Sequence, residues 1–300
     1  MKRLLIVGCG DVATRALPLL AKSYRVSALA RSGGEVARLQ ALGIAAGLAD
    51  LDQPGSLQAF DFGADCLLHC APPPNAGASD TRTGNLIAAL TRAGRTGEGK
   101  SAAILPRRVV YLSTTGVYGD CAGARVDETR EPRPQTSRAM RRLDAEQALR
   151  GWANDSGASL VILRVPGIYA ADRLPLARLR AGLPVLRAED DVFSNHIHAN
   201  DLGCIIAAAL APGAASGIFN ASDDTEMKMG DYFDLVADRH GLQRPPRISR
   251  AEAATRVSPE LLSFWSESRR LANRRMKQEL GIRLVYPTVH EGIPLASEVH

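Results

Sequence analysis

The sequence predicts an α/β fold that contains a doubly wound parallel sheet and a smaller mixed C-terminal region. Short apolar runs alternate with helical patterns from the first residues to about residue 164. The first run, Leu4 to Val7, is apolar throughout, as expected for a parallel strand that is covered on both faces. After Pro166, prolines and short segments interrupt the alternation, which predicts the second, smaller region.

The predicted elements follow one another in a regular order. Apolar runs predict strands at residues 4–7, 25–29, 44–48, 65–70, 109–112, 160–164 and 217–220. Helical patterns lie between them, at residues 12–20, 35–42, 85–93, 136–152 and 202–210, and residues 94–108 are expected to form a loop. We therefore predict a first domain of residues 1–165, to which residues 196–222 return, and a small C-terminal substrate region of residues 166–195 and 223–300.

The composition is that of an ordinary globular enzyme, with 45% hydrophobic and 23% charged residues in 300. The five cysteines are scattered and form no C-x-x-C pair, so neither a disulfide framework nor a metal site is indicated, and a reducing cytoplasm fits best. No apolar run is long enough for a secretory signal or a membrane span. The arginines between Arg269 and Arg275 lack interleaved aromatic residues, so nucleic-acid binding is not favoured.

A glycine-rich turn joins the first strand to the first helix. Residues 8–13 have the pattern G-x-G-x-x-A, in which the first glycine allows the turn, the second lets a pyrophosphate approach and the alanine lets the helix pack on the strand. The helix N-terminus adds unpaired N–H groups and a positive dipole end. The position between a strand and a helix favours a dinucleotide site over an ordinary turn. The expected cofactor contacts in this loop are Gly8, Gly10, Asp11, Val12 and Ala13.

The end of the second strand distinguishes the two nicotinamide cofactors. A site for NAD usually has Asp or Glu there, but this chain has Ala30, Arg31 and Ser32. Arg31 can pair with a 2′-phosphate and Ser32 can donate to it, so we expect NADP in preference to NAD; alternatively, Arg31 is only a surface residue. Asp50 could accept from the adenine amino group, or Asp50 or Asp52 could cap a helix.

Several motifs together resemble one enzyme family. They are the glycine loop, the Ala71–Pro73 turn, the segment Leu112 to Asp120, the segment Leu163 to Tyr169 and the segment His196 to Leu202. The chain is similar to extended short-chain dehydrogenases/reductases of the NAD-dependent epimerase/dehydratase group, and especially to its atypical members. The resemblance implies a Rossmann core, a small-molecule substrate held between this core and the C-terminal region, and a homodimer as a common assembly. It also implies cofactor contacts at Ala71, Pro72, Ser113 and Pro166.

The catalytic set of that family is only partly present. It consists of Ser or Thr, followed by Tyr and Lys four residues apart on a helix. Thr114 matches the hydroxyl position, and Glu146 is similar to a glutamate of the family's helix. Counting back from Glu146 places Arg142 at the Lys position and Arg138 at the Tyr position. Arg142 can supply the cation and bond a ribose, but Arg138 cannot replace Tyr because a guanidinium does not release its proton near neutral pH.

Two explanations remain open for a site without the tyrosine. In one, another acid/base acts: Tyr118, Tyr169 and His196 are candidates by their position near strand ends, and the ordinary pKa of His196 suits the task. In the other, the protein binds the dinucleotide without hydride transfer and acts as a regulatory or scaffold protein. Arg138 and Arg142 could also clamp an anionic substrate group, or lie on a solvated helix face.

The residues expected to contact substrate come from both regions. Tyr118 and Tyr169 are expected as walls of the pocket, and Arg269 lies four residues before Asn273, so that both could face the substrate from one helix; alternatively, Asn273 caps that helix. The sequence therefore favours an NADP(H)-binding oxidoreductase or epimerase that acts on a small polar molecule. The expected substrate contacts are Thr115, Tyr118, Arg138, Tyr169 and Arg269.

Overall fold

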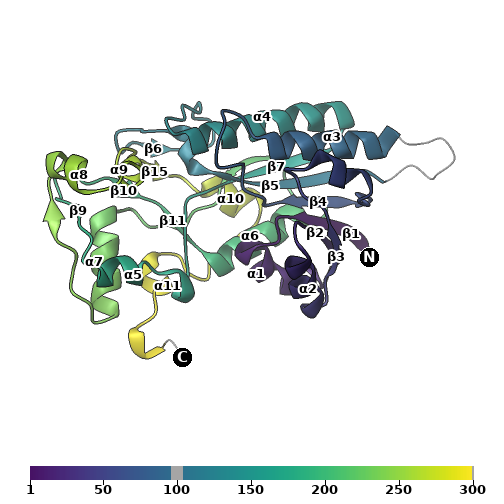
Figure 1. The fold of residues 1–300 in the computed structure, drawn as a ribbon. Helices are drawn as coiled ribbons and strands as arrows, with labels where there is room; N and C mark the ends of the chain where they lie inside the picture. Colours follow the sequence, from purple (N-terminus) through teal and green to yellow (C-terminus); the bar gives the residue numbers. More distant parts are fainter. Residues whose placement is uncertain (96–103, 299–300) are drawn as a thin grey trace.

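A computed structural model describes residues 1–95 and 104–298. Its centre is a seven-stranded parallel sheet in the order β12-β7-β5-β4-β1-β2-β3, with the strand order reversing next to β1 (Figure 1). The predicted doubly wound α/β fold is therefore confirmed. The strands are β1 (Lys2–Val7), β2 (Tyr24–Ala30), β3 (Ala45–Leu48), β4 (Cys66–His69), β5 (Arg108–Thr114), β7 (Ser159–Val165) and β12 (Gly217–Asn220).

Helices cover both faces of this sheet, which explains why its strands are apolar throughout. On one face α3 (Thr81–Arg95) and α4 (Ser137–Ser156) pack on β4, β5 and β7. On the other lie α1 (Asp11–Leu20), α2 (Gly33–Ala41) and α6 (Ala199–Leu210), with α6 directly against α1. Each face has its own apolar core, so the carboxyl ends of the strands are held by packing from both sides.

The predicted helices and strands of the first domain are all present; the strand at 217–220 has the predicted bounds, and the other elements differ at one or both ends. The helix expected from residue 85 begins at Thr81, because the Asp80 carboxylate accepts from the backbone N–H of Thr83 at 3.2 Å. The helix expected to end at residue 152 continues to Ser156 and stops where Gly157 adopts a left-handed conformation, φ 70°. Residues 96–103 of the predicted loop lie outside the described residues.

The C-terminal region gathers at one end of the main sheet (Figure 1). Four two-stranded sheets pair β8 (Gly167–Tyr169) with β11 (His196–His198), β9 (Val185–Leu186) with β14 (Arg247–Ile248), β10 (Phe193–Ser194) with β13 (Met227–Lys228), and β6 (Arg125–Val126) with β15 (Arg270–Leu271). The helices are α5 (Leu176–Arg180), α7 (Met229–Arg239), α8 (Arg250–Arg256), α9 (Pro259–Phe264), α10 (Arg274–Glu279) and α11 (Val289–Gly292). Short 3₁₀ turns are η1 (Pro54–Gln58), η2 (Thr115–Tyr118), η3 (Ala171–Arg173) and η4 (Ala296–Glu298). The exact division into two domains stays a prediction.

One local expectation is wrong. Arg269 and Asn273 do not lie one turn apart on a helix, because β15 runs between them and α10 begins only at Arg274. Asn273 occupies the N-cap position, but its side-chain amide donates to the carbonyls of Ser222 and Asp223 at 2.9 and 3.1 Å. Within residues 1–95 and 104–298, no helix combines the length and apolarity that a membrane span requires.

Candidate functional site

A cavity of about 250 Å³ lies at the carboxyl ends of β1, β2 and β4. This is the place where a doubly wound sheet binds its ligands, next to the reversal of strand order. Six further lining residues were not identified as site residues from the sequence: Val7, Leu29, Glu35, Leu51, Cys70 and Arg82. The sequence-predicted residues that line it are Gly8, Gly10, Arg31, Asp50, Ala71 and Pro72.

The two glycines of the loop have different tasks. Gly8 has φ +87°, and a Cβ there would overlap the backbone nitrogen of Ala71 and lie 2.6 Å from its Cα. A Cβ on Gly10 would meet no atom within 4 Å, so this glycine leaves space open at the cavity. Ala13 is 1% exposed and packs against the sheet. Gly8 therefore shapes the loop, whereas Gly10 leaves room for a ligand.

The N-terminus of α1 is available to an anion. Gly10 is the N-cap and provides no side-chain cap, so the first amides of the helix, which include those of Asp11 and Val12, have no side-chain partner. Although desolvation opposes it, hydrogen bonds from Arg15 and Arg173 lower the pKa of the Asp11 carboxyl. The Arg173 contact measures 2.7 Å and ties α1 to η3 of the C-terminal region.

Arg31 and Ser32 directly follow the end of β2. Glu35, which was not identified from the sequence, lies beside them. The exposed side chain of Arg31 lines the cavity, and its backbone N–H donates to Glu35 Oε2 at 3.0 Å. The Ser32 hydroxyl caps α2 by accepting from the N–H of Glu35 at 3.2 Å. Ser followed three residues later by Glu is the sequence signal that could have placed Glu35 there. Arg38 is nearby, because its Nη2 donates to the carbonyl of Cys9 at 2.6 Å.

Arg82, which lines the cavity, is held by an ion pair. Arg82 contacts both carboxylate oxygens of Asp52, at 2.8 and 2.6 Å, and donates to the carbonyl of Pro72 at 3.1 Å. The hydrogen bond from Arg82 lowers the pKa of Asp52. Asp50 Oδ1 accepts from the N–H of Asp52 at 2.9 Å, and no helix begins at either aspartate. The Arg82–Asp52 pair joins segments about 30 positions apart.

Arg142 lies at the end of β5. Its Nη1 donates to the carbonyl of Leu112 at 2.8 Å and to the Tyr111 hydroxyl at 3.2 Å. Burial, together with the Arg142 charge, lowers the pKa of His69 to about 3. Ser113, by contrast, donates its hydroxyl to Glu146 Oε1 of α4 at 2.5 Å and is not among the residues that line the cavity.

The N-terminal part of α4, which carries Arg138 and Arg142, packs beside the end of β5 and the η2 turn. Thr114 ends β5, and its Oγ1 accepts from the N–H of Gly116 at 3.2 Å. A Cβ on Gly116 would lie 3.5 Å from that of Ala139 and 3.6 Å from Thr114 Oγ1, so the first turn of α4 packs on η2. Arg138 precedes Ala139 and is exposed.

The other predicted side chains are in the interior. Thr115 is buried, Tyr118 donates to Asn220 Oδ1 at 2.8 Å, and Tyr169 donates to the carbonyl of Thr288 at 3.2 Å. His196 stacks on Tyr232 with ring centroids 4.3 Å apart, and burial lowers its pKa to about 3. Because the ring is neutral near pH 7, His196 lacks the titration near neutral pH that suits an acid/base. Pro166 is half-buried between β7 and β8.

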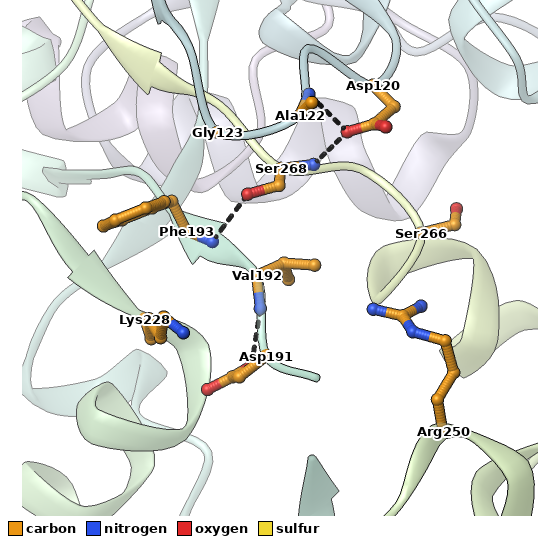
Figure 2. Close-up of a pocket in the computed structure, with 10 residues that line it drawn as sticks. All are labelled: Asp120, Ala122, Gly123, Asp191, Val192, Phe193, Lys228, Arg250, Ser266 and Ser268. Atoms are coloured by element: carbon orange, nitrogen blue, oxygen red, sulfur yellow. Dashed lines mark hydrogen bonds between the residues drawn. The ribbon is translucent and has the colours of Figure 1, made fainter. Parts of the chain in front are cut away.

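A second cavity, of about 460 Å³, lies in the C-terminal region (Figure 2). Asp120 Oδ1 accepts from the N–H of Ser268 at 2.8 Å, and Ser268 Oγ accepts from the N–H of Phe193 at 3.0 Å. Figure 2 shows Lys228 and Arg250 on opposite sides of this space. The sequence did not reveal this cavity because it is assembled from separate segments.

Arg269 joins the same region to the turn after β5. Its Nη1 donates to the carbonyl of Gly119 at 2.7 Å and to Glu267 Oε2 at 2.9 Å. Glu267 is a further residue that was not identified from the sequence. The segment that carries Ser266 and Ser268 into the second cavity therefore also carries Glu267 and Arg269 toward Gly119.

The comparison with protein families agrees with this architecture. Residues 10–220 match the model of the NAD dependent epimerase/dehydratase family. The chain belongs to this family. Its members are dinucleotide-dependent enzymes by description, and the matched residues extend from the glycine loop to β12. No curated protein matches the sequence significantly.

Solved structures show the same fold over nearly the whole chain. A conserved protein of unknown function from Silicibacter pomeroyi is 29% identical, with a TM-score of 0.77 and coverage of 97% of this chain and 96% of that one. UDP-glucose 4-epimerase from Thermotoga maritima, solved with UDP-glucose, is 15% identical, with a TM-score of 0.76 and coverage of 99% and 97%. UDP-glucose 4-epimerase from Thermus thermophilus, solved with NAD, is 22% identical, with a TM-score of 0.73 and coverage of 99% and 98%.

Proposed function

We propose that this member of the family is an NADP(H)-binding oxidoreductase or epimerase that acts on a small polar substrate. The observation that carries the proposal is the first cavity, where the open side of Gly10, the uncapped start of α1 and the Arg31 side chain lie together. Their chemistry fits a dinucleotide: amide donors for a pyrophosphate and a guanidinium for a 2′-phosphate. A related fold was solved with NAD, which supports a dinucleotide as the cofactor.

Three side chains take the roles nearest to the reaction. Thr114 hydrogen-bonds the reacting oxygen of the substrate, and Arg142, fixed by Leu112 and Tyr111, bonds the nicotinamide ribose. Arg138 binds a polar or anionic group of the substrate. The nicotinamide supplies hydride exchange when it is bound. We assign packing roles to Tyr118, Tyr169 and His196. The two tyrosine hydroxyls are hydrogen-bonded in the interior, and the His196 ring stacks on Tyr232.

The second cavity suits the remainder of a polar substrate. Lys228 and Arg250 offer cations, while Asp120 and Ser268 offer oxygen atoms that can contact hydroxyl groups. A related fold was solved with UDP-glucose, a ligand that combines hydroxyl groups with negative charge. We therefore propose a polyhydroxylated, negatively charged substrate class.

Calorimetric titration with NADPH and, in parallel, with NADH tests the cofactor part of the proposal. We expect tight NADPH binding and weaker NADH binding. Absorbance at the NADPH band, followed with UDP-glucose, UDP-glucuronic acid and a panel of aldoses and ketoses, then tests turnover. Failure of both dinucleotides to bind would refute the proposal at its first step.

One observation favours a second function. Arg138 stands on the helix where the resemblance places the proton-transferring tyrosine, and a guanidinium does not exchange its proton near neutral pH. A regulatory protein that senses NADP without turnover would tolerate this change. Tight NADPH binding, no turnover across the panel and an NADPH-dependent association with a partner protein would together favour this alternative.

A further inference from the structure

A turn with unusual backbone angles, Gly119–Gly123, lies directly after η2 and borders the second cavity. Gly119 has φ 67° and Gly123 has φ 75°. Between them Ala122 has φ 50°, and in the part of the chain that the structure describes it is the only residue other than glycine with a positive φ. A residue with a side chain keeps this conformation only where its surroundings enforce it, and such positions are frequent at functional sites. Asp120, Ala122 and Gly123 all line the cavity.

The C-terminal region holds this turn in place through Ser268. The backbone N–H groups of Cys121 and Gly123 donate to the carbonyl of Ser268 at 3.1 and 2.9 Å. In return, the N–H of Ser268 donates to Asp120 Oδ1 at 2.8 Å, and the N–H of Ala122 donates to the same oxygen at 3.1 Å (Figure 2). Two backbone amides from separate segments therefore fix the orientation of the Asp120 carboxylate.

The second oxygen of this carboxylate is left for a ligand. Both hydrogen bonds that the Asp120 side chain makes within the described residues end on Oδ1, and the residue is exposed at the cavity. Asp191, the other acid that lines the cavity, differs in this respect. Its side chain is 2% exposed, and its two oxygens accept from the backbone N–H groups of Val192 and Gly230, each at 2.8 Å. Asp120 Oδ2 is therefore the carboxylate oxygen that this cavity offers.

The charges of the cavity indicate which group fits this oxygen. A carboxylate oxygen accepts hydrogen bonds, so the ligand atom beside it must be a donor. An ammonium group would enter a cavity that also holds Lys228 and Arg250, whose side chains contact backbone carbonyls rather than carboxylates. A phosphate or carboxylate group would be repelled by Asp120 itself. A neutral hydroxyl group meets neither repulsion.

We propose that Asp120 Oδ2 accepts a hydrogen bond from one hydroxyl group of the substrate, and that Asp120 thereby determines which hydroxylated ligands the second cavity binds. This inference rests on the proposed function, which places the polar remainder of the substrate in this cavity. It adds the atom that contacts the hydroxyl group. Asp120 acts here in substrate selection and takes no part in hydride transfer.

Asp120→Asn tests this role without disturbing the turn, because the amide oxygen can still accept from Ala122 and Ser268 while an NH₂ group replaces Oδ2. Calorimetry with saturating NADPH measures the binding of UDP-glucose and UDP-glucuronic acid, and the tighter of the two serves as the probe. We expect Asp120→Asn to bind the probe about tenfold more weakly, because a hydrogen bond to a charged acceptor becomes one between neutral groups. Binding of NADPH should not change, since Asp120 does not line the first cavity.

Asp127→Asn is the matched control. Asp127 is also exposed and uses Oδ1 to accept from a backbone N–H two residues later, that of Thr129 at 2.9 Å, but it lines neither cavity. This variant should bind the probe like the wild type. Thermal denaturation of both variants checks the fold.

Analogues of the probe that each lack one hydroxyl group then identify the contact. For one analogue, the wild type and Asp120→Asn should bind with equal affinity, because the hydroxyl group that Asp120 contacts is missing. For the other analogues, the difference of about tenfold should persist.

The outcomes separate this inference from the function on which it rests. Equal binding of the probe by the wild type and Asp120→Asn would overturn the role of Asp120 and leave the proposed function standing. A loss that is the same for every analogue, or that accompanies a lower melting temperature, would show a structural role and overturn it as well. A wild type that binds NADPH but neither UDP-sugar would refute the proposed substrate class, and the inference would fall with it.

Discussion

Glu146 and Arg164 form an ion pair in the interior, with side chains 0% and 1% exposed. Arg164 Nε lies 3.1 Å from Oε1 and its Nη2 lies 2.7 Å from Oε2, so the pair joins α4 to β7 through two hydrogen bonds. Positions four apart share a helix face, so fixing Glu146 also helps to place Arg142, whose guanidinium reaches Leu112 and Tyr111 of β5. The correspondence of Arg142 and Arg138 with the family's Lys and Tyr stays a prediction.

Removing one partner of this pair should destabilise the whole domain. We expect Glu146→Ala to lower the free energy of unfolding by about 3–5 kcal/mol, because the Arg164 charge remains buried without its partner. Urea denaturation measures this change. Arg150→Ala is the control, since Arg150 is 46% exposed and lies 3.6 Å from the same carboxylate, and it should cost less than about 1 kcal/mol. Equal losses in the two variants would contradict the assignment.

The parts of the site that the sequence revealed are local in the chain. The glycine loop, Arg31 and Ser32 lie within consecutive segments whose turns and strand ends can be recognised from residue type alone. The contact between Arg269 and the carbonyl of Gly119 could not be found in this way, because the two residues lie 150 positions apart. Such a pair becomes visible only when packing brings the segments together.

The surroundings of a side chain were harder to infer from the sequence than the element on which it lies. His196 lies on β11, a short strand that the sequence did not predict; the ring of Tyr232 from α7 stacks on it, and burial keeps it neutral. Ser113 is at the expected strand end, but its hydroxyl donates to Glu146. In both cases the residue type suggested chemistry, and a neighbour distant in sequence determined what the side chain does.

The two glycines of the loop should respond differently to alanine. Gly10→Ala should leave the free energy of unfolding within about 1 kcal/mol of the wild type, because a Cβ there meets no atom within 4 Å. It should nevertheless weaken NADPH binding by about tenfold or more, since the methyl group occupies the space for a pyrophosphate. Gly8→Ala should destabilise the protein by about 2 kcal/mol or more, because of its positive φ and the clash with Ala71. Thermal denaturation and calorimetry measure the two effects, and unchanged NADPH affinity in Gly10→Ala would disprove the placement.

Cofactor preference should depend on opposite charges at Arg31 and Glu35. Arg31→Glu should weaken NADPH binding by about 10–100-fold and NADH binding much less, because only NADPH carries the 2′-phosphate. Glu35→Gln should strengthen NADPH relative to NADH, because a carboxylate that lines the cavity is removed. Paired titrations with the two dinucleotides measure both changes. Arg25→Glu, on the exposed early part of β2, should alter neither affinity, and equal weakening of both dinucleotides by Arg31→Glu would refute the assignment.

Asp223 should make stability depend on pH. Burial raises the pKa of its carboxyl to about 7, above the unfolded value of about 4. Between these two values the folded protein holds a proton that the unfolded chain has released, so this contribution to stability is present at low pH and is lost as pH rises toward 7. Relative to Asp223→Asn, the wild type should lose up to about 1.4 kcal/mol per pH unit in this range and no more above it. Urea denaturation at a series of pH values measures the difference, and a constant difference would rule out the buried acid as its source.

Loss of the Arg142 charge at the end of β5 should weaken cofactor binding more than it destabilises the fold. Arg142 is half-buried and reaches Leu112 and Tyr111, where burial raises the pKa of the Tyr111 hydroxyl to about 12 and so keeps it a neutral partner. Arg142→Met should weaken NADPH binding by about tenfold or more, because a charged hydrogen bond to the ribose is lost. Tyr111→Phe keeps the guanidinium but removes one of its two supports, so its effect on NADPH affinity should be smaller and in the same direction. Calorimetry on both variants, with thermal denaturation as the check on folding, measures the ranking. If Tyr111→Phe weakened NADPH binding while Arg142→Met did not, the arginine would not be the group that contacts the cofactor.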